Sequence, residues 1–134
     1  MAGGKTIRDP LRKKEVVLTP EEQVRQWFIG LLKDRYGVPE HMMSSEVPFT
    51  LGNKHYRADI VVWGRDLAPR ILVECKRPEV TLDEKVLSQA VDYNRVLDVP
   101  YMVITNGLKT YALSRADNGD YSFIQEIPQF SLIR

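Results

Sequence analysis

The chain has 134 residues, of which 19 are basic and 18 acidic, so its formal net charge at pH 7 is +1. This length suits one domain with one core, and 43% hydrophobic with 28% charged residues is typical of a soluble globular protein. With this balance of charge the protein is not strongly basic, so its pI alone does not indicate nucleic-acid binding. No apolar run approaches the roughly 20 residues of a membrane span.

Residues 1–14 are predicted to form a basic N-terminal arm. Its charged residues are Lys5, Arg8, Asp9, Arg12, Lys13 and Lys14. Such an arm can hold a phosphate backbone, although solvated surface charge is the commoner explanation. Met1–Lys5 has no apolar stretch, so we expect no secretory signal and a cytoplasmic location. The single cysteine, Cys75, excludes an internal disulfide and is expected to be a small buried hydrophobe.

The first helix follows residues 15–18, which read as a short strand or an extended lead-in. The segment Thr19–Glu22 has the sequence of a capping box, with Thr19 as N-cap and Pro20 at the first helical position. The helix is predicted to run to about Tyr36, where Gly37 ends it. Its apolar stripe, at helical spacing, is Val24, Trp27, Phe28, Leu31 and Leu32.

Strands are predicted next at about 45–51, 56–63 and 70–76. A second capping-box sequence, Thr81–Glu84, predicts a helix to about Leu97. Further strands are predicted at about 101–105, 110–113 and 121–124, with Asn106-Gly107 as a tight turn between the first two. This order predicts one α/β domain over residues 1–134, with a mixed central β-sheet flanked by helices.

Charged side chains gather at the end of the strand hairpin formed by 56–63 and 70–76. Side chains alternate along a strand, so Glu74 and Lys76 lie on one face and Cys75 on the other. With a turn over 64–69, Trp63 pairs with Arg70, Val62 with Ile71 and Asp59 with Glu74.

Paired residues have Cβ atoms about 4.5–5.5 Å apart. Two carboxylates at that separation repel each other unless positive charge lies between them. A divalent cation with oxygen ligands, beside Lys76, would supply that charge, and this is the arrangement of a metal-dependent nuclease. The alternative is a salt bridge from Lys76 to Glu74 or Asp59 that only seals the strand end.

The first helix offers a third acid. On a helical projection Glu21 lies on the same side as Val24 and Phe28, whereas Glu22 lies roughly opposite and is explained by the capping box. Glu21 is therefore the candidate that joins the metal cluster, the alternative being a favourable interaction with the helix dipole.

The second helix carries Gln89 and Tyr93 four residues apart, on one face. Leu82, Val86 and Leu97 extend that face, so we expect it to pack inward. A glutamine there needs a partner, such as the strand-end acids or a bound nucleotide. A core tyrosine with a satisfied amide is the alternative.

Taken together, these motifs resemble the N-terminal nuclease domain of type I restriction enzyme R subunits, which belongs to the PD-(D/E)XK nuclease superfamily. The resemblance covers about residues 19–107, and residues 108–134 are a less diagnostic extension of C-terminal strands. The segments that carry it are Thr19–Gln26, Ala58–Val62, Val73–Lys76, Gln89-x3-Tyr93 and Thr105–Gly107. The chain departs from the superfamily's Pro-Asp, which is Ala58-Asp59 here.

The resemblance implies a restriction-endonuclease-like core and hydrolysis of DNA phosphodiester bonds with Mg²⁺ or Mn²⁺. The implied catalytic residues are Asp59, Glu74, Lys76 and Glu21, with Gln89 and Tyr93 as the accompanying Gln-x3-Tyr element. The implied metal ligands are Asp59, Glu74 and Glu21, with the Cys75 carbonyl as a further ligand.

The resemblance also implies partners. We expect DNA contacts mainly to phosphate, with little intrinsic sequence specificity. Type I R subunits carry a motor and rely on a separate specificity subunit, but this sequence contains no GxxxxGK[ST] motif. The chain is therefore expected to be a free-standing relative or an excised domain.

Two other functions are compatible with the same fold. One is a non-catalytic nucleic-acid-binding or assembly module, which would bind without metal-dependent turnover. The other is a structure-specific nuclease for branched DNA; such resolvases act as dimers, so a stable two-fold assembly would favour it.

Overall fold

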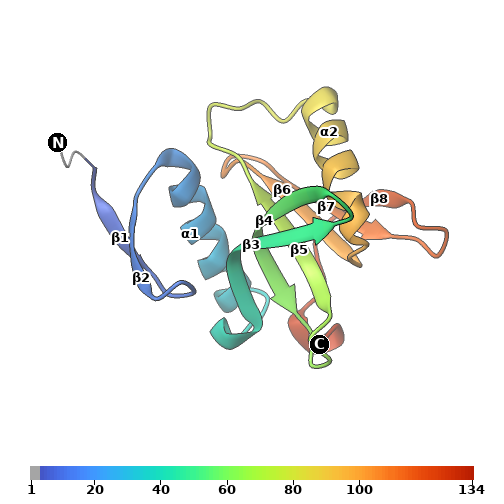
Figure 1. The fold of residues 1–134 in the computed structure, drawn as a ribbon, viewed down its shortest axis with the longest axis horizontal. Coiled ribbons are helices and arrows are strands. Elements are labelled where there is room, and N and C mark those ends of the chain that lie inside the picture. Colours follow the sequence, from blue (N-terminus) through green and yellow to red (C-terminus); the bar gives the residue numbers. More distant parts are fainter. Residues whose placement is uncertain (1–3) are drawn as a thin grey trace.

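The computed structural model describes residues 4–134. The strands and helices, in chain order (Figure 1), are β1 Thr6–Asp9, β2 Lys14–Val17, α1 Pro20–Asp34, η1 Glu40–Met42, β3 Met43–Leu51, β4 Lys54–Trp63, β5 Pro69–Cys75, α2 Glu84–Asn94, η2 Arg95–Leu97, β6 Tyr101–Thr105, β7 Thr110–Arg115, β8 Tyr121–Ile124 and η3 Phe130–Leu132. No helix of this described part is both long and apolar enough to cross a membrane.

The centre of the molecule is a six-stranded sheet with the strand order β3-β4-β5-β6-β7-β8. β5 and β6 run parallel, and the other neighbours are antiparallel. A parallel pair needs a long crossover, and the segment containing α2 supplies it. The predicted mixed sheet and α/β class are confirmed.

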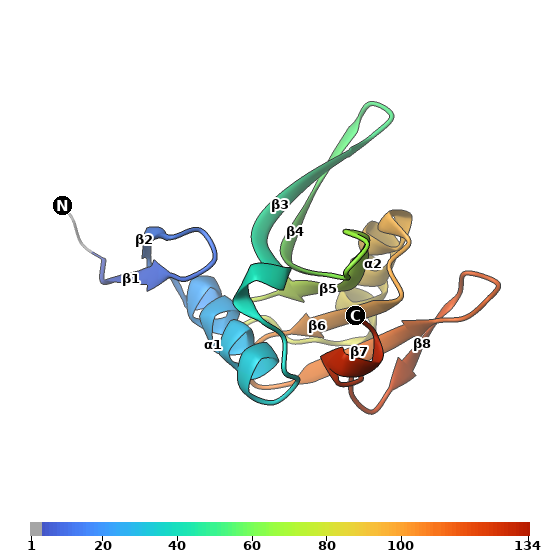
Figure 2. The ribbon, with the colours of Figure 1, turned by 90° about the horizontal axis from the view of Figure 1, so that it is seen from below.

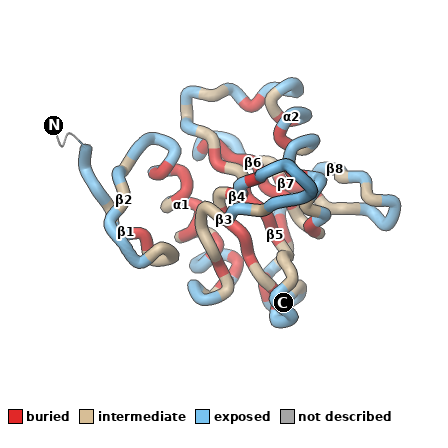
Figure 3. The backbone as a smooth tube through the Cα atoms, viewed as in Figure 1, coloured by how far each residue is buried: buried red, intermediate tan, exposed pale blue. Residues whose placement is uncertain are grey.

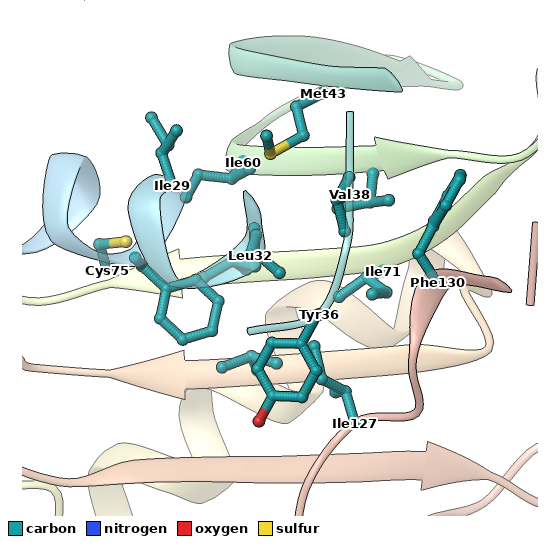
Figure 4. Close-up of a cluster of buried hydrophobic side chains, with 14 of the residues drawn as sticks. Ile29, Leu32, Tyr36, Val38, Met43, Ile60, Ile71, Cys75, Ile127 and Phe130 are labelled. Atoms are coloured by element: carbon teal, nitrogen blue, oxygen red, sulfur yellow. The ribbon is translucent and has the colours of Figure 1, made fainter. Parts of the chain in front are cut away.

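The sheet has a hydrophobic core on each face, because its central strands alternate side chains between the two helices. Ile60 and Val62 of β4 pack with Leu32 on the α1 side, while Val61 packs with Leu87 on the α2 side. Figure 4 shows the core under α1, and Figure 3 shows burial concentrated in the middle of the sheet. Continuous apolar runs in these strands reflect burial of both faces.

The start of α1 agrees with its sequence signal, with one difference. The Thr19 hydroxyl accepts a hydrogen bond from the Glu22 N–H at 3.1 Å. The return bond of a capping box is not made, because the Thr19 N–H donates to the Val17 carbonyl. Gly37 follows the helix with a φ of 71°, as a helix-ending glycine should. Trp27, which was predicted to be in the stripe, is 45% exposed.

Two other local predictions are corrected. Val62 pairs with Ile71 as expected, but Trp63 pairs with Pro69 instead of Arg70, because the register shifts after Val62. The second helix is capped by Asp83, whose carboxylate accepts from the Val86 N–H at 2.9 Å, and not by the first residue of the capping-box sequence.

The N-terminal segment is a hairpin where the sequence indicated a basic arm. β1 pairs with β2 from Thr6↔Val17 to Asp9↔Lys14, and residues 1–3 of the expected arm lie outside the described residues. Asp9, which is fully buried, accepts hydrogen bonds from Arg12 and from the Leu11 N–H. Arg12 is thus tied to the protein itself, and its charge is not free for a phosphate backbone.

Replacing Asp9 should therefore loosen this hairpin. Burial raises the pKa of Asp9, but hydrogen bonds from Arg12, the Leu11 N–H and Gln26 outweigh it, so the pKa lies below its ordinary 3.8. The stabilisation is complete above that value and is lost as the pH falls through the folded-state pKa. We expect Asp9→Asn to lower the free energy of unfolding at pH 7 by about 2 kcal/mol.

Urea unfolding over a pH series measures this effect. The difference between wild type and Asp9→Asn should shrink below the ordinary pKa of 3.8. Asp117→Asn, in an exposed loop, is the matched control and should change little. A difference that grows on acidification would contradict the ion-pair explanation.

Candidate functional site

The residues singled out from the sequence meet at one cavity of about 520 Å³, bounded by the start of α1, by β4, by the end of β5 and by α2. The ones that line it are Glu21, Asp59, Glu74, Cys75, Lys76, Gln89 and Tyr93. The structure therefore brings together side chains that lie up to 72 positions apart, from Glu21 to Tyr93 (93 − 21).

Asp59 is the carboxylate at the edge where β4 meets β5. One of its oxygens accepts the Cys75 N–H at 2.7 Å, and the other accepts from Arg25 at 3.2 Å. Burial is the largest influence on Asp59 and raises its pKa. The Cys75 N–H and Arg25 lower the pKa, Glu21 raises it again, and the net shift is upward. Asp59 therefore sits where additional positive charge would stabilise its ionised form.

Glu74 and Lys76 project from one side of the chain at the end of β5, as the alternation predicts. Lys76 Nζ lies 2.9 Å from a Glu74 oxygen. The other Glu74 oxygen accepts from the Asn94 side chain at 2.7 Å, and Asn94 also donates to the Ala90 carbonyl. Asn94 is buried and escaped the sequence analysis, although its position four residues after Ala90 is the signal that could have found it.

The two acids in the first turn of α1 have separate environments. The Glu21 side chain is 48% exposed and lies 3.1 Å from Arg25. Glu22, predicted to lie opposite the apolar stripe, is instead buried and pairs with Arg25 and Arg12 while accepting from Gln26. Of these two acids, only Glu21 lines the cavity. Glu22 has a structural role, as predicted, but it fills that role through ion pairs and not through a capping box.

Arg25 is the charged residue beside the site that the sequence analysis missed. Its side chain is 4% exposed, and its guanidinium faces Glu21, Glu22, Glu46 and Asp59. Its position on the buried face of α1, next to Val24 in the chain, was the available signal. An arginine on an inward helix face needs carboxylate partners, and the acids of this site provide them.

Gln89 and Tyr93 lie on the cavity side of α2. Both residues are exposed, contrary to the expectation that this face of the helix packs inward. The buried residues of this helix are Leu87, Ala90 and Asn94. The Tyr93 hydroxyl accepts the Arg57 N–H at 3.2 Å, and its ring lies 5.1 Å from that of Tyr56. α2 therefore presents this pair to the cavity and contacts β4 through the tyrosine.

Cys75 contributes its backbone to the site. Its thiol is buried, and burial, with the negative charge of Asp59, holds the thiol pKa well above its ordinary value. The thiol stays protonated at neutral pH and is a poor nucleophile. The expectation that Cys75 is a small buried hydrophobe is confirmed.

The donor set suits a hard divalent cation. Mg²⁺ usually takes one or two carboxylates and completes its shell with water and substrate phosphate. Asp59 and Glu74 provide two carboxylates in an open cavity, with Glu21 at its rim. Across residues 4–134 no three His, Cys, Asp or Glu side chains are already arranged around a metal position, and the two carboxylates are paired with Arg25 and Lys76. The residues fit an Mg²⁺ site of the two-carboxylate kind.

Comparisons with known proteins point to one family. Residues 20–128 match the family described as type I restriction enzyme R protein N terminus. A solved structure described as a fragment of a putative HsdR subunit of a type I restriction enzyme from Vibrio vulnificus YJ016 has the same fold, with a TM-score of 0.63 and 21% identity. The match covers 87% of this chain and 24% of that one. A comparison with curated proteins gave no match.

The buried charge of Arg25 should be essential for stability. Arg25→Met leaves several carboxylates at the site without their shared cation, so we expect the free energy of unfolding to fall by about 3 kcal/mol. Arg35→Met is the control, because the Arg35 side chain is 59% exposed and pairs with Glu126 on the surface. That variant should lose less than about 1 kcal/mol in urea unfolding. Equal losses in the two variants would contradict this account of Arg25.

Proposed function

The chain belongs to the family of type I restriction enzyme R protein N-termini, and from this premise we propose that it is a divalent-metal-dependent DNA endonuclease domain of the PD-(D/E)XK superfamily, with a restriction-endonuclease-like core. The observation that carries the proposal is the convergence of Asp59, Glu74 and Lys76 on one cavity. Two carboxylates and a lysine are the groups that metal-assisted hydrolysis of a phosphodiester needs.

Asp59 and Glu74 would hold Mg²⁺ or Mn²⁺, with Glu21 as a direct or water-bridged ligand and the Cys75 carbonyl as a further one. When bound, the cation lowers the pKa of a water and neutralises charge on the scissile phosphate. Asp59 is held for this role by the Cys75 N–H and Arg25. Glu74 is oriented by the Asn94 amide from α2.

Lys76 is the proposed proton-handling residue. Its ammonium group lies 2.9 Å from Glu74, and the Lys76 side chain is about one-third exposed, so it can reach both a water and a phosphate oxygen in the cavity. As an ammonium it would orient the attacking water and offset the negative charge that builds on the phosphate, whereas deprotonation of the water would require the neutral amine as the proton acceptor. Gln89 and Tyr93 would hold α2 against the site or contact DNA phosphate.

The partners follow from the family. The Vibrio fragment is about four times as long as the part matched here. We propose that this domain works in a type I restriction complex, in the cytoplasm, with other subunits or domains that supply the motor and the choice of target. Its own DNA contacts would then be mainly to phosphate.

A second function has one observation in its favour. The carboxylates of the cavity are already paired with cations of the protein, Asp59 with Arg25 and Glu74 with Lys76. A chain whose cavity carboxylates already have cationic partners can serve as a nucleic-acid-binding or assembly module with the same fold.

Removing Lys76 separates the two functions. We expect Lys76→Ala to reduce nicking of plasmid DNA in Mg²⁺ or Mn²⁺ by about 10²–10³-fold. Lys85→Ala, an exposed lysine in the first turn of α2, is the control and should cleave like the wild type. Calorimetric titration with Mn²⁺ should show binding to Lys76→Ala and none to Asp59→Asn. Wild-type cleavage by Lys76→Ala would exclude the lysine from the mechanism.

The two glutamates of α1 make a second test. Glu21→Gln should lower metal affinity and cleavage by about 10–100-fold with little change in stability. Glu22→Gln should instead lower the free energy of unfolding by about 3 kcal/mol, because it breaks a buried ion pair. Thermal unfolding and Mn²⁺ titration of both variants measure the difference. The reverse pattern would assign the cavity acid to Glu22.

A further inference from the structure

The β3–β4 hairpin extends beyond the sheet. β4 pairs with β3 from Lys54 onward, but its pairing with β5 runs only from Ile60 to Trp63. Residues 54–59 therefore belong to a two-stranded ribbon, which stands out from the body of the molecule in Figure 2. At its tip Gly52, with a φ of 61°, occupies the first central position of a tight turn.

The ribbon leaves the sheet at the level of the candidate site. Ladder pairing is interrupted at Glu46, which lies between the pairs Ser45↔Ile60 and Val47↔Ala58 and has a φ of 52°. A non-glycine residue in this conformation marks a local bend. The residue across the interruption is Asp59, so the bend sets the direction of the ribbon at the cavity itself.

Beyond its base, where Glu46 and Asp59 lie, the ribbon contains basic residues and no acidic one. Residues 47–58 contain Lys54, His55 and Arg57 and no Asp or Glu. Alternation along the strand places His55 and Arg57 on the same face as Asp59. The Arg57 side chain lies 3.8 Å from Glu46 at the base of the ribbon, but it is 65% exposed, compared with 18% for Arg12, and it also lines the cavity. Arg57 thus presents an exposed cation beside the site, and Lys54 presents a second exposed cation near the tip, on the opposite face of β4.

The opposite face of the ribbon is fixed on α2. The Tyr56 ring lies 5.1 Å from that of Tyr93, whose hydroxyl accepts the Arg57 N–H. Lys54 Nζ lies 5.3 Å above the Tyr56 ring, at the end of this contact. The ribbon is therefore anchored beside the cavity, and Arg57 and Lys54 keep defined positions relative to Asp59.

We propose that the β3–β4 hairpin binds duplex DNA and guides its backbone to the cavity, with Arg57 and Lys54 contacting phosphates. This inference rests on the proposed nuclease function and assigns its DNA-binding surface. The major groove of B-form DNA admits a two-stranded ribbon, whereas that of an RNA duplex is too narrow for side chains to read. Contacts of this kind position the duplex without selecting its sequence.

The test measures binding without cleavage. Fluorescence anisotropy with a labelled DNA duplex, in EDTA and over a series of salt concentrations, compares the wild type with the double variant Lys54→Gln/Arg57→Gln. Two lost phosphate contacts should reduce the slope of log affinity against log salt by about 2 and weaken binding roughly tenfold at physiological salt. The control, Lys33→Gln/Arg35→Gln, removes two exposed cations at the far end of α1 and should bind like the wild type.

Three results would overturn the hairpin assignment: wild-type affinity and salt slope in the double variant, no binding of duplex DNA by the wild type, or tighter binding of an RNA duplex of the same sequence. Thermal unfolding of both double variants confirms that they are folded, as exposed substitutions should be. A wild type that binds through the hairpin but cleaves nothing with Mn²⁺ would refute the nuclease function alone.

Discussion

The structure depends most on the buried guanidinium of Arg25. It is paired with Glu21 and Glu22 on its own helix, Glu46 on β3 and Asp59 on β4. A charge this deeply buried is tolerated only when carboxylates surround it, so the pairing fixes α1 against the edge of the sheet. The distance from Glu21 to Asp59, and with it the shape of the cavity, follows from that single arginine.

Two carboxylates, the fully buried Asp9 and the partly buried Asp59, are affected by their surroundings in opposite directions. Asp9 has its hydrogen bonds supplied by Arg12 and neighbouring groups, and its pKa falls. Asp59 is also paired with an arginine, but burial and the nearby Glu21 outweigh the pairing, and its pKa rises. A carboxylate that is incompletely neutralised by the protein is available to a ligand of positive charge. Such a site costs stability, which is a common property of functional sites.

Much of the fold could be predicted because it is recorded in local patterns. The continuous apolar run around Val61 and Leu72 indicated a strand buried on both faces, and the pairing of Val62 with Ile71 followed from the turn between the strands. The hairpin β1–β2 could not be predicted in this way. Its charged residues are typical of a solvated arm, and one of the contacts that hold them joins Arg12 to Glu22, ten positions later in the chain.

For the candidate site, the sequence by itself determined which side chains are present and which of them share a face, because the periods of strands and helices are local properties. It therefore identified Glu74 with Lys76 and Gln89 with Tyr93. Only the tertiary structure decided how these pairs meet, that Asn94 and Arg25 hold the acids, and that Glu22 is buried while Glu21 opens on the cavity. Those facts depend on contacts between distant segments, which no local pattern records.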